Sequence, residues 1–140
     1  MRVTIQQTQH LEYKNMNLKH YILDENRQPK EAELLEWAEW FETNKARISK
    51  QTREGKYFIS SVFLGLDHNW GDGEPILWET MVFEDIEPVE EEIFGKKYTR
   101  THKDIFQKRY HTEHKMLLQH NELIWDIKQG KNIQNYNLDK

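Results

Sequence analysis

The stretch SSVFLGLDHNWGDGEPILWETMVFED, residues 60–85, constrains the fold of this chain most strongly. Both of its ends are rich in β-branched and aromatic residues, which favour strands. Between them, Gly71 and Gly73 can adopt positive φ angles, and Pro75 suits the entrance of a strand. The stretch therefore predicts a central β-hairpin over residues 57–84 with a wide loop.

The two strands of this hairpin differ in the side chains that they place on their faces. Apolar residues occupy both alternating faces from Tyr57 to Leu66, so this strand is expected to be covered on both sides. In the second strand, Glu79 shares a face with apolar neighbours. A buried carboxylate must be paired, hydrogen-bonded or protonated. Two interpretations stay open: Glu79 belongs to a polar site, or it reaches solvent or an arginine of a helix.

The loop of the hairpin carries further candidate site residues. Asp67 and His68 end the first strand on opposite faces, and Trp70 and Asp72 follow them. A loop tryptophan must pack on the body of the protein, on a partner or on a ligand, because its apolar area is large. The alternative is that the loop only makes the turn.

Two amphipathic helices are expected to pack on the hairpin. The first spans Glu31 to about Lys50, with Pro29 near its start. The second begins at Thr101, whose hydroxyl would cap it with Asp104 in a capping-box position, and continues to Ile127.

Side-chain spacing and two short strands complete the predicted architecture. Trp37 and Phe41 lie on the apolar stripe of the first helix and are expected in the core, whereas Trp40 lies off it and is expected at an interface. Short strands are predicted at residues 21–23 and 96–100. The resulting order is β-α-β-β-β-α, a small antiparallel sheet with two helices in the α+β class.

Composition bounds the organisation of the chain. We expect an extended N-terminal arm over residues 1–20, a single domain over 21–128, and a polar, disordered tail over 129–140. The sequence has no cysteine and no long apolar run, so a cytoplasmic protein without disulfides or membrane contact is expected.

Charge is segregated along the sequence. Residues 31–92 hold sixteen acidic and five basic residues, whereas residues 95–120 hold seven basic and two acidic ones. The acidic run over residues 84–92 is expected to be a solvated loop. Either the two segments pack together or pair between subunits, or the basic helix, including Arg109, binds an anion.

Several of the candidate residues are of types that can ligate a metal. His111 and His114 would lie at i and i+3 on one helical face, where two imidazoles can chelate, and Glu79, Asp67 or His68 could add ligands. The spacing matches no complete ligand motif, so no metal or cofactor is expected.

The residues resemble a family of small, functionally uncharacterised proteins encoded mainly by tailed phages and prophages. The resemblance covers about Tyr21 to His111 and rests on VFLGLDHNWGDGEPILWETMVF, on YILD with the WAEWFE segment, and on YTRTHKDIFQKRYH. The matching positions include Trp37, Trp40, Phe41, Asp67, His68, Gly71, Gly73, Pro75, Glu79, Thr80 and His111. Trp70, His102 and Tyr110 depart from the family pattern, which has Phe, Trp and Gly there.

This resemblance implies an accessory protein that acts by binding. We expect a host-directed inhibitor, for example one that acts against host defence, that binds a host protein or a small, nucleotide-like anionic ligand and forms a homo-oligomer. The alternative is a small metal-assisted hydrolase that uses Asp67, His68, Glu79 and His111. A structural role and a double-stranded RNA-binding-like module are further alternatives, although the acidic segment disfavours nucleic acid.

Overall fold

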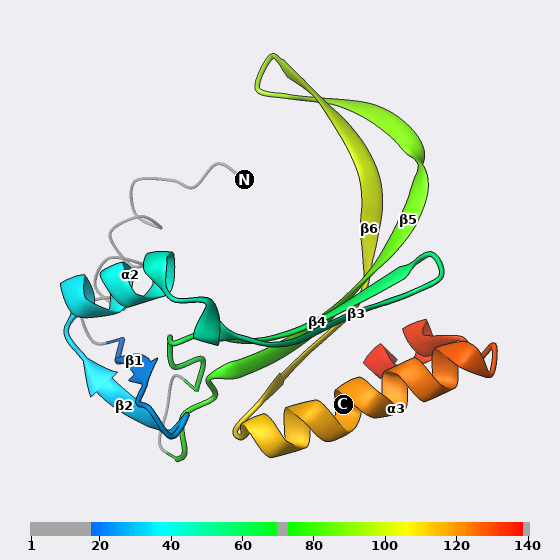
Figure 1. The fold of residues 1–140 in the computed structure, drawn as a ribbon. Helices are drawn as coiled ribbons and strands as arrows, with labels where there is room; N and C mark the ends of the chain where they lie inside the picture. The colour runs from blue at the N-terminus through cyan, green and yellow to red at the C-terminus, as the bar shows by residue number, and fades with distance from the viewer. Residues whose placement is uncertain (1–17, 70–72, 139–140) are drawn as a thin grey trace.

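The computed structural model of the chain describes residues 18–69 and 73–138 (Figure 1). These residues form a two-stranded sheet of β1 (His20–Leu23) and β2 (Pro29–Ala32), helix α2 (Leu34–Thr43), and a four-stranded sheet that precedes helix α3 (Glu113–Lys128). The α+β class is confirmed, but the structure has two strands more than predicted, one before and one after α2. None of the helices in the described part of the chain is long and apolar enough to cross a membrane.

The four-stranded sheet is an antiparallel meander in the order β3-β4-β5-β6. Its strands are β3 (Ile48–Glu54), β4 (Tyr57–Phe63), β5 (Trp78–Ile93) and β6 (Lys96–Tyr110). β4 and β5 pair from Tyr57 opposite Glu84 to Phe63 opposite Trp78, which confirms the predicted hairpin.

β5 is longer than the sequence predicted. The acidic run over residues 84–92, expected to be a loop, lies within β5, and its two ends stand opposite basic residues of β6: Glu84 opposite Lys103 and Glu92 opposite Lys97. Arg100 Nε lies 2.8 Å from Glu91 Oε1, and Lys103 Nζ lies 3.7 Å from Glu84 Oε2. The opposite charges therefore meet across one ladder of a single chain, where such cross-strand pairs are favourable.

The predicted second helix is wrong over residues 101–110, because these residues form the end of β6. Thr101 and Asp104 are strand residues, and the hydroxyl of Thr112 caps α3 instead, accepting from the Lys115 amide at 3.2 Å. A register shift beside Val82 adds one residue to β6, so Ile105 and Phe106 are both buried. This bulge breaks the two-residue period and gives the segment a helix-like spacing.

α3 covers one face of the sheet and forms the main core with it (Figure 1). Met116 and Leu123 of α3 are fully buried, as are Ile59 and Phe63 of β4. The opposite face of the sheet is different, because Phe58 is only half-buried there. The expectation that β4 is covered on both faces is therefore wrong.

α2 is shorter than predicted and stands at the edge of the core. Residues 48–50 belong to β3, and Asn44 ends the helix, its side chain accepting from the Ala46 amide. Trp37 and Phe41 are only half-buried. Trp40, expected off the core-facing stripe, packs on the core, with its ring 5.8 Å from that of Phe63, and it is only half-buried.

The end of the chain also packs on the domain. Ile133 is 2% exposed within a short 3-10 helix at Ile133–Leu138. The hydroxyl of Tyr136 donates to Asp126 of α3, and this bond raises the pKa of Tyr136 to about 12. Within the segment 129–140, expected to be a disordered tail, the described residues therefore include a short 3-10 helix that contacts the domain. Of the N-terminal arm expected over residues 1–20, residues 1–17 lie outside the described residues, and His20 begins β1.

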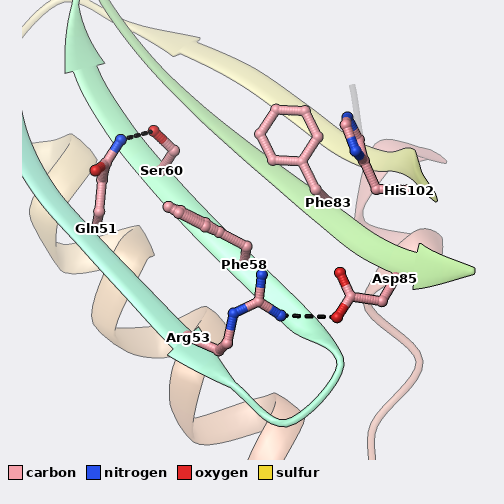
Figure 2. Close-up of a pocket in the computed structure, with 7 residues that line it drawn as sticks. All are labelled: Gln51, Arg53, Phe58, Ser60, Phe83, Asp85 and His102. Atoms are coloured by element: carbon pink, nitrogen blue, oxygen red, sulfur yellow. Dashed lines mark hydrogen bonds and ion pairs between the residues drawn. The ribbon is translucent and has the colours of Figure 1, made fainter. Parts of the chain in front are cut away.

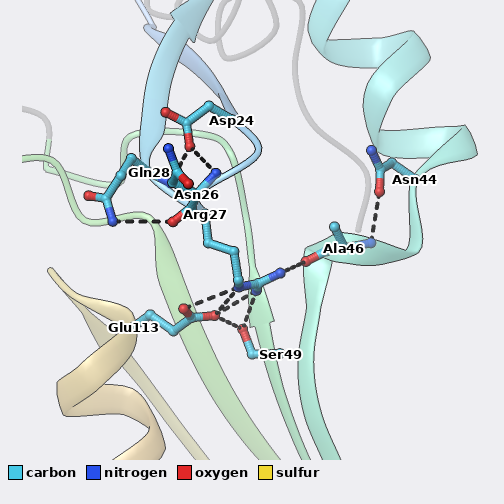
Figure 3. Close-up of polar contacts among 8 residues, drawn as sticks. All are labelled: Asp24, Asn26, Arg27, Gln28, Asn44, Ala46, Ser49 and Glu113. Atoms are coloured by element: carbon cyan, nitrogen blue, oxygen red, sulfur yellow. Dashed lines mark hydrogen bonds and ion pairs between the residues drawn. The ribbon is translucent and has the colours of Figure 1, made fainter.

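Arg27 joins the small sheet to the rest of the domain (Figure 3). Its guanidinium donates to Glu113 of α3, with Nη2 2.6 Å from Oε2, and to the Ala46 carbonyl at 3.0 Å. The hydroxyl of Ser49 also donates to Glu113, at 2.7 Å. Burial raises the pKa of Glu113, but the hydrogen bonds from Arg27 and Ser49 outweigh it, so the pKa is lowered overall.

Candidate functional site

The loop between β4 and β5 uses its predicted site residues to hold its own shape. Asp67 Oδ1 accepts from the Asn69 amide at 2.8 Å and from the Ile76 amide at 3.1 Å. This pattern is that of a carboxylate that closes a loop. Trp70 and Asp72 lie outside the described residues.

Two predicted histidines bind the backbone of the same loop. His68 Nδ1 donates to the Leu66 carbonyl at 2.8 Å, and His111 Nδ1 donates to the Pro75 carbonyl at 3.1 Å. His111 precedes α3, which begins at Glu113, so it does not share a helical face with His114 as predicted. In the described ranges, no three His, Asp or Glu residues are grouped so as to hold a metal ion.

Glu79 is buried and paired. Its Oε2 accepts from Arg109 Nε at 3.0 Å and from Gln107 Nε2 at 2.8 Å, both on β6. Arg109 stands directly opposite Glu79 in the ladder. Of the two interpretations of Glu79, pairing with an arginine is the one observed, although this arginine lies on a strand. Glu79 and Arg109 therefore come together, but neither is hydrogen-bonded to His68 or His111.

A buried hydrogen-bonded chain beneath α3 was not predicted. Ser61 Oγ lies 2.7 Å from His120 Nδ1 and 2.6 Å from Thr80 Oγ1, and Thr52 Oγ1 lies 2.9 Å from His120 Nε2. Burial, with a smaller effect of Lys50, lowers the pKa of His120 to about 4. Ser61 and His120 resemble a nucleophile and its base, but both are 0% exposed. This row of hydrogen bonds holds α3 on the sheet, and a substrate cannot reach it.

The uncovered face of the four-stranded sheet carries a hollow of about 300 Å³ (Figure 2). All four strands contribute to it. It is lined by Gln51, Arg53, Phe58, Ser60, Phe83, Asp85 and His102. Phe58 and Phe83 stand opposite each other on β4 and β5 and form its floor. The volume lies at the lower end of the range for small-molecule sites.

A second surface extends from the sheet. The pairing of β4 with β5 reaches only as far as Glu84, which stands opposite Tyr57, the first residue of β4. Residues 86–101 of β5 and β6 therefore form a two-stranded ribbon, here called the β-arm, which curves away from the sheet (Figure 1). Val89, Ile93 and Tyr98 share one face of the β-arm by alternation and are 42%, 48% and 50% exposed. Phe94 at the tip is 77% exposed.

Sequence patterns could have indicated both surfaces only in part. Phe58 and Phe83 lie at alternating positions in strands that were predicted correctly, but their pairing depends on the register. The β-arm was not predicted, because the acidic residues of its first strand were interpreted as a solvated loop. Comparisons of the chain with protein-family models, curated proteins and solved structures find no match, so the resemblance to phage proteins stays a prediction.

Proposed function

We propose that this protein acts by binding a protein partner through the β-arm, and that Phe94 is the anchor of this contact. The observation that carries the proposal is the state of Phe94, which is 77% exposed and has a φ angle of 52°. Phe94 and Gly95 form a two-residue hairpin turn, a type that favours Asn-Gly. The turn itself therefore gives no reason for a phenylalanine at this position.

Two unfavourable features therefore coincide in one residue. A positive φ angle costs a non-glycine residue on the order of 1–3 kcal/mol. An exposed aromatic ring forgoes the roughly 1.5–3 kcal/mol that its burial would contribute. Such local conflicts are typical of functional positions. Burial of the ring in a partner would recover the second contribution.

The surroundings of Phe94 indicate the chemistry of the partner. Lys96 and Lys97 follow the turn on β6, and Glu91 and Glu92 precede it on β5. The partner would present an apolar pocket for the ring, with acidic groups facing the lysines and basic groups facing the glutamates. Val89, Ile93 and Tyr98 would extend the apolar contact along the β-arm, as in interfaces with a few dominant anchors.

The resemblance to phage proteins supports a host-directed inhibitor that acts in the host cytoplasm, for example against host defence. Stoichiometric binding agrees with such a role, because an inhibitor needs no turnover. The hydrolase alternative has less support, since Asp67, His68 and His111 each bind loop backbone and Glu79 is paired with Arg109.

The test is affinity capture from host lysate followed by binding measurements with the purified captured protein. We expect the unaltered protein and the control Leu118→Ala to bind it in a fixed stoichiometry, and Phe94→Asn to bind at least about tenfold more weakly, as for an interface anchor. Leu118 is a suitable control because it is 57% exposed on α3. Equal binding by Phe94→Asn would refute the proposal.

The same variants test the expected homo-oligomer. Light scattering of the purified protein at micromolar concentration measures its mass in solution. A dimer that Phe94→Asn converts to a monomer would identify the partner as a second copy of this chain. A dimer that persists in Phe94→Asn would place the contact between copies elsewhere on the molecule.

A further inference from the structure

We infer that the hollow on the uncovered sheet face binds a planar nitrogen heteroaromatic ligand of the nucleobase class. This inference concerns a different surface from the β-arm and does not depend on it. The lining residues form a row across the sheet, with Arg53 on β3, Phe58 on β4, Phe83 on β5 and His102 on β6 (Figure 2).

The rings in this row are arranged edge to face. Phe58 and Phe83 have ring centroids 6.5 Å apart with planes at 64°, and Phe83 and His102 have centroids 5.3 Å apart with planes at 87°. In an edge-to-face contact the edge of one ring meets one face of its neighbour, and the opposite face takes no part in the contact. A flat ligand can therefore stack on a ring face that these contacts leave open. Aromatic rings on the central strands of an open sheet are a known means of stacking bases.

Polar groups surround the aromatic floor with both donors and acceptors. Gln51 Nε2 donates to Ser60 Oγ at 3.1 Å, and Arg53 Nη1 donates to Asp85 Oδ2 at 2.9 Å. The side chains of Arg53 and Asp85 are 55% and 52% exposed, so a ligand can reach them. An amide, a hydroxyl, a guanidinium and a carboxylate match the alternating donors and acceptors on the edge of a base.

Charge and size favour a single base over a nucleic acid strand. The opposite charges of Arg53 and Asp85 neutralise each other within the hollow. The guanidinium of Arg53 also lies over Phe58, with its carbon atom 5.6 Å from the ring centroid. A surface that binds a polyanion requires an excess of positive charge. The hollow of about 300 Å³ has room for a base or a nucleoside. A purely aliphatic ligand would leave these polar groups without new partners.

The experiment is a titration of the full chain with adenosine, guanosine, cytidine and uridine, followed by amide NMR. We expect at least one nucleoside, at millimolar concentration or below, to shift the resonances of β4 and β5 around Phe58 and Phe83. Phe83→Leu keeps apolar volume but removes the ring, and should weaken binding about fivefold or more, the lower end for one stacking partner. Leu118→Ala on α3 and Phe94→Asn on the β-arm should bind as the unaltered protein does.

Gln51→Ala is the second variant if Phe83→Leu does not fold. This substitution leaves the aromatic row intact. It should weaken binding of the preferred nucleoside more than binding of the others, since it removes one contact to the edge of the base. Three results would overturn the inference: no nucleoside shifts these resonances, cyclohexanol shifts them as strongly, or a single-stranded oligonucleotide binds far more tightly than any nucleoside. Equal affinity of Phe83→Leu and the unaltered protein would also overturn it.

Discussion

His120 of α3 and Ser61 of β4 lie within hydrogen-bond distance, 2.7 Å apart, although 59 positions separate them and both are fully buried. A buried polar pair of this kind stabilises one packing arrangement only while the imidazole stays neutral.

Acid should therefore destabilise the protein through His120. Its folded pKa is about 4, below its usual value of 6.5, so the unfolded state binds more protons between these values. The stabilising contribution is complete above pH 6.5 and is lost as the pH falls to about 4, a loss of about 3 kcal/mol. Urea denaturation at several pH values measures it. His120→Gln should show a smaller loss over the same window, and an equal loss would contradict the assignment.

Gly65→Ala should destabilise the protein strongly. Gly65 has a φ angle of 73°, and a methyl group there would lie 2.3 Å from Nε1 of Trp37 and 2.8 Å from the Tyr21 carbonyl oxygen. We expect a loss of at least about 2 kcal/mol in the free energy of unfolding, since strain and overlap add.

Gly55→Ala is the matched control for this steric effect. Gly55 has a φ angle of 58° but no atom within 4 Å of the added methyl group. Only backbone strain applies, so the loss should be about 1 kcal/mol. If both variants lose the same free energy in urea denaturation, the close approach of Trp37 to Gly65 has no energetic consequence.

Glu113→Gln should loosen the small sheet from α3. The change removes the negative charge to which Arg27 and Ser49 donate hydrogen bonds. We expect about 1 kcal/mol of destabilisation, because water screens the partly buried Arg27–Glu113 ion pair only in part. Since the folded pKa of Glu113 is lowered, this contribution is present above its unfolded pKa and is lost as the pH falls below it.

Hydrogen exchange of β1 and β2 amides is the direct measurement for Glu113→Gln, since local opening raises their exchange rates. Lys19→Ala serves as a control, because Lys19 and Glu31 form an ion pair in which both side chains are more than half exposed. That variant should leave stability nearly unchanged. Faster exchange in Lys19→Ala than in Glu113→Gln would be inconsistent with the role of Arg27.

Phe94→Asn should stabilise the isolated protein while weakening partner binding. Asparagine tolerates a positive φ angle better than phenylalanine, so up to about 1 kcal/mol of strain should be relieved. Phe94→Ala should weaken binding without this gain, because alanine is also strained at this φ angle. Thermal unfolding of the three proteins separates the effects, and a less stable Phe94→Asn would show that the ring supports the fold.

The sequence alone determined the α+β class, the hairpin over residues 57–84, the short strand at 21–23 and the beginning of β6 at residues 96–100. These features depend on alternation and turn-forming residues within a few positions of each other, which act locally. It also pointed to Glu79 as a carboxylate in need of a partner, because its neighbours in the strand are apolar.

Tertiary structure decided the rest, because the deciding contacts join distant residues. Residues 101–110 form a strand rather than a helix because β5 supplies their hydrogen-bond partners. The bulge at Ile105 interrupts the alternation of apolar and polar residues by which a strand is predicted. Phe58 and Phe83 form the floor of the hollow because the register places them opposite each other. Burial of His120 likewise depends on where α3 lies on the sheet. Local preference cannot specify a register or a packing partner, since each depends on the free energy of the whole fold.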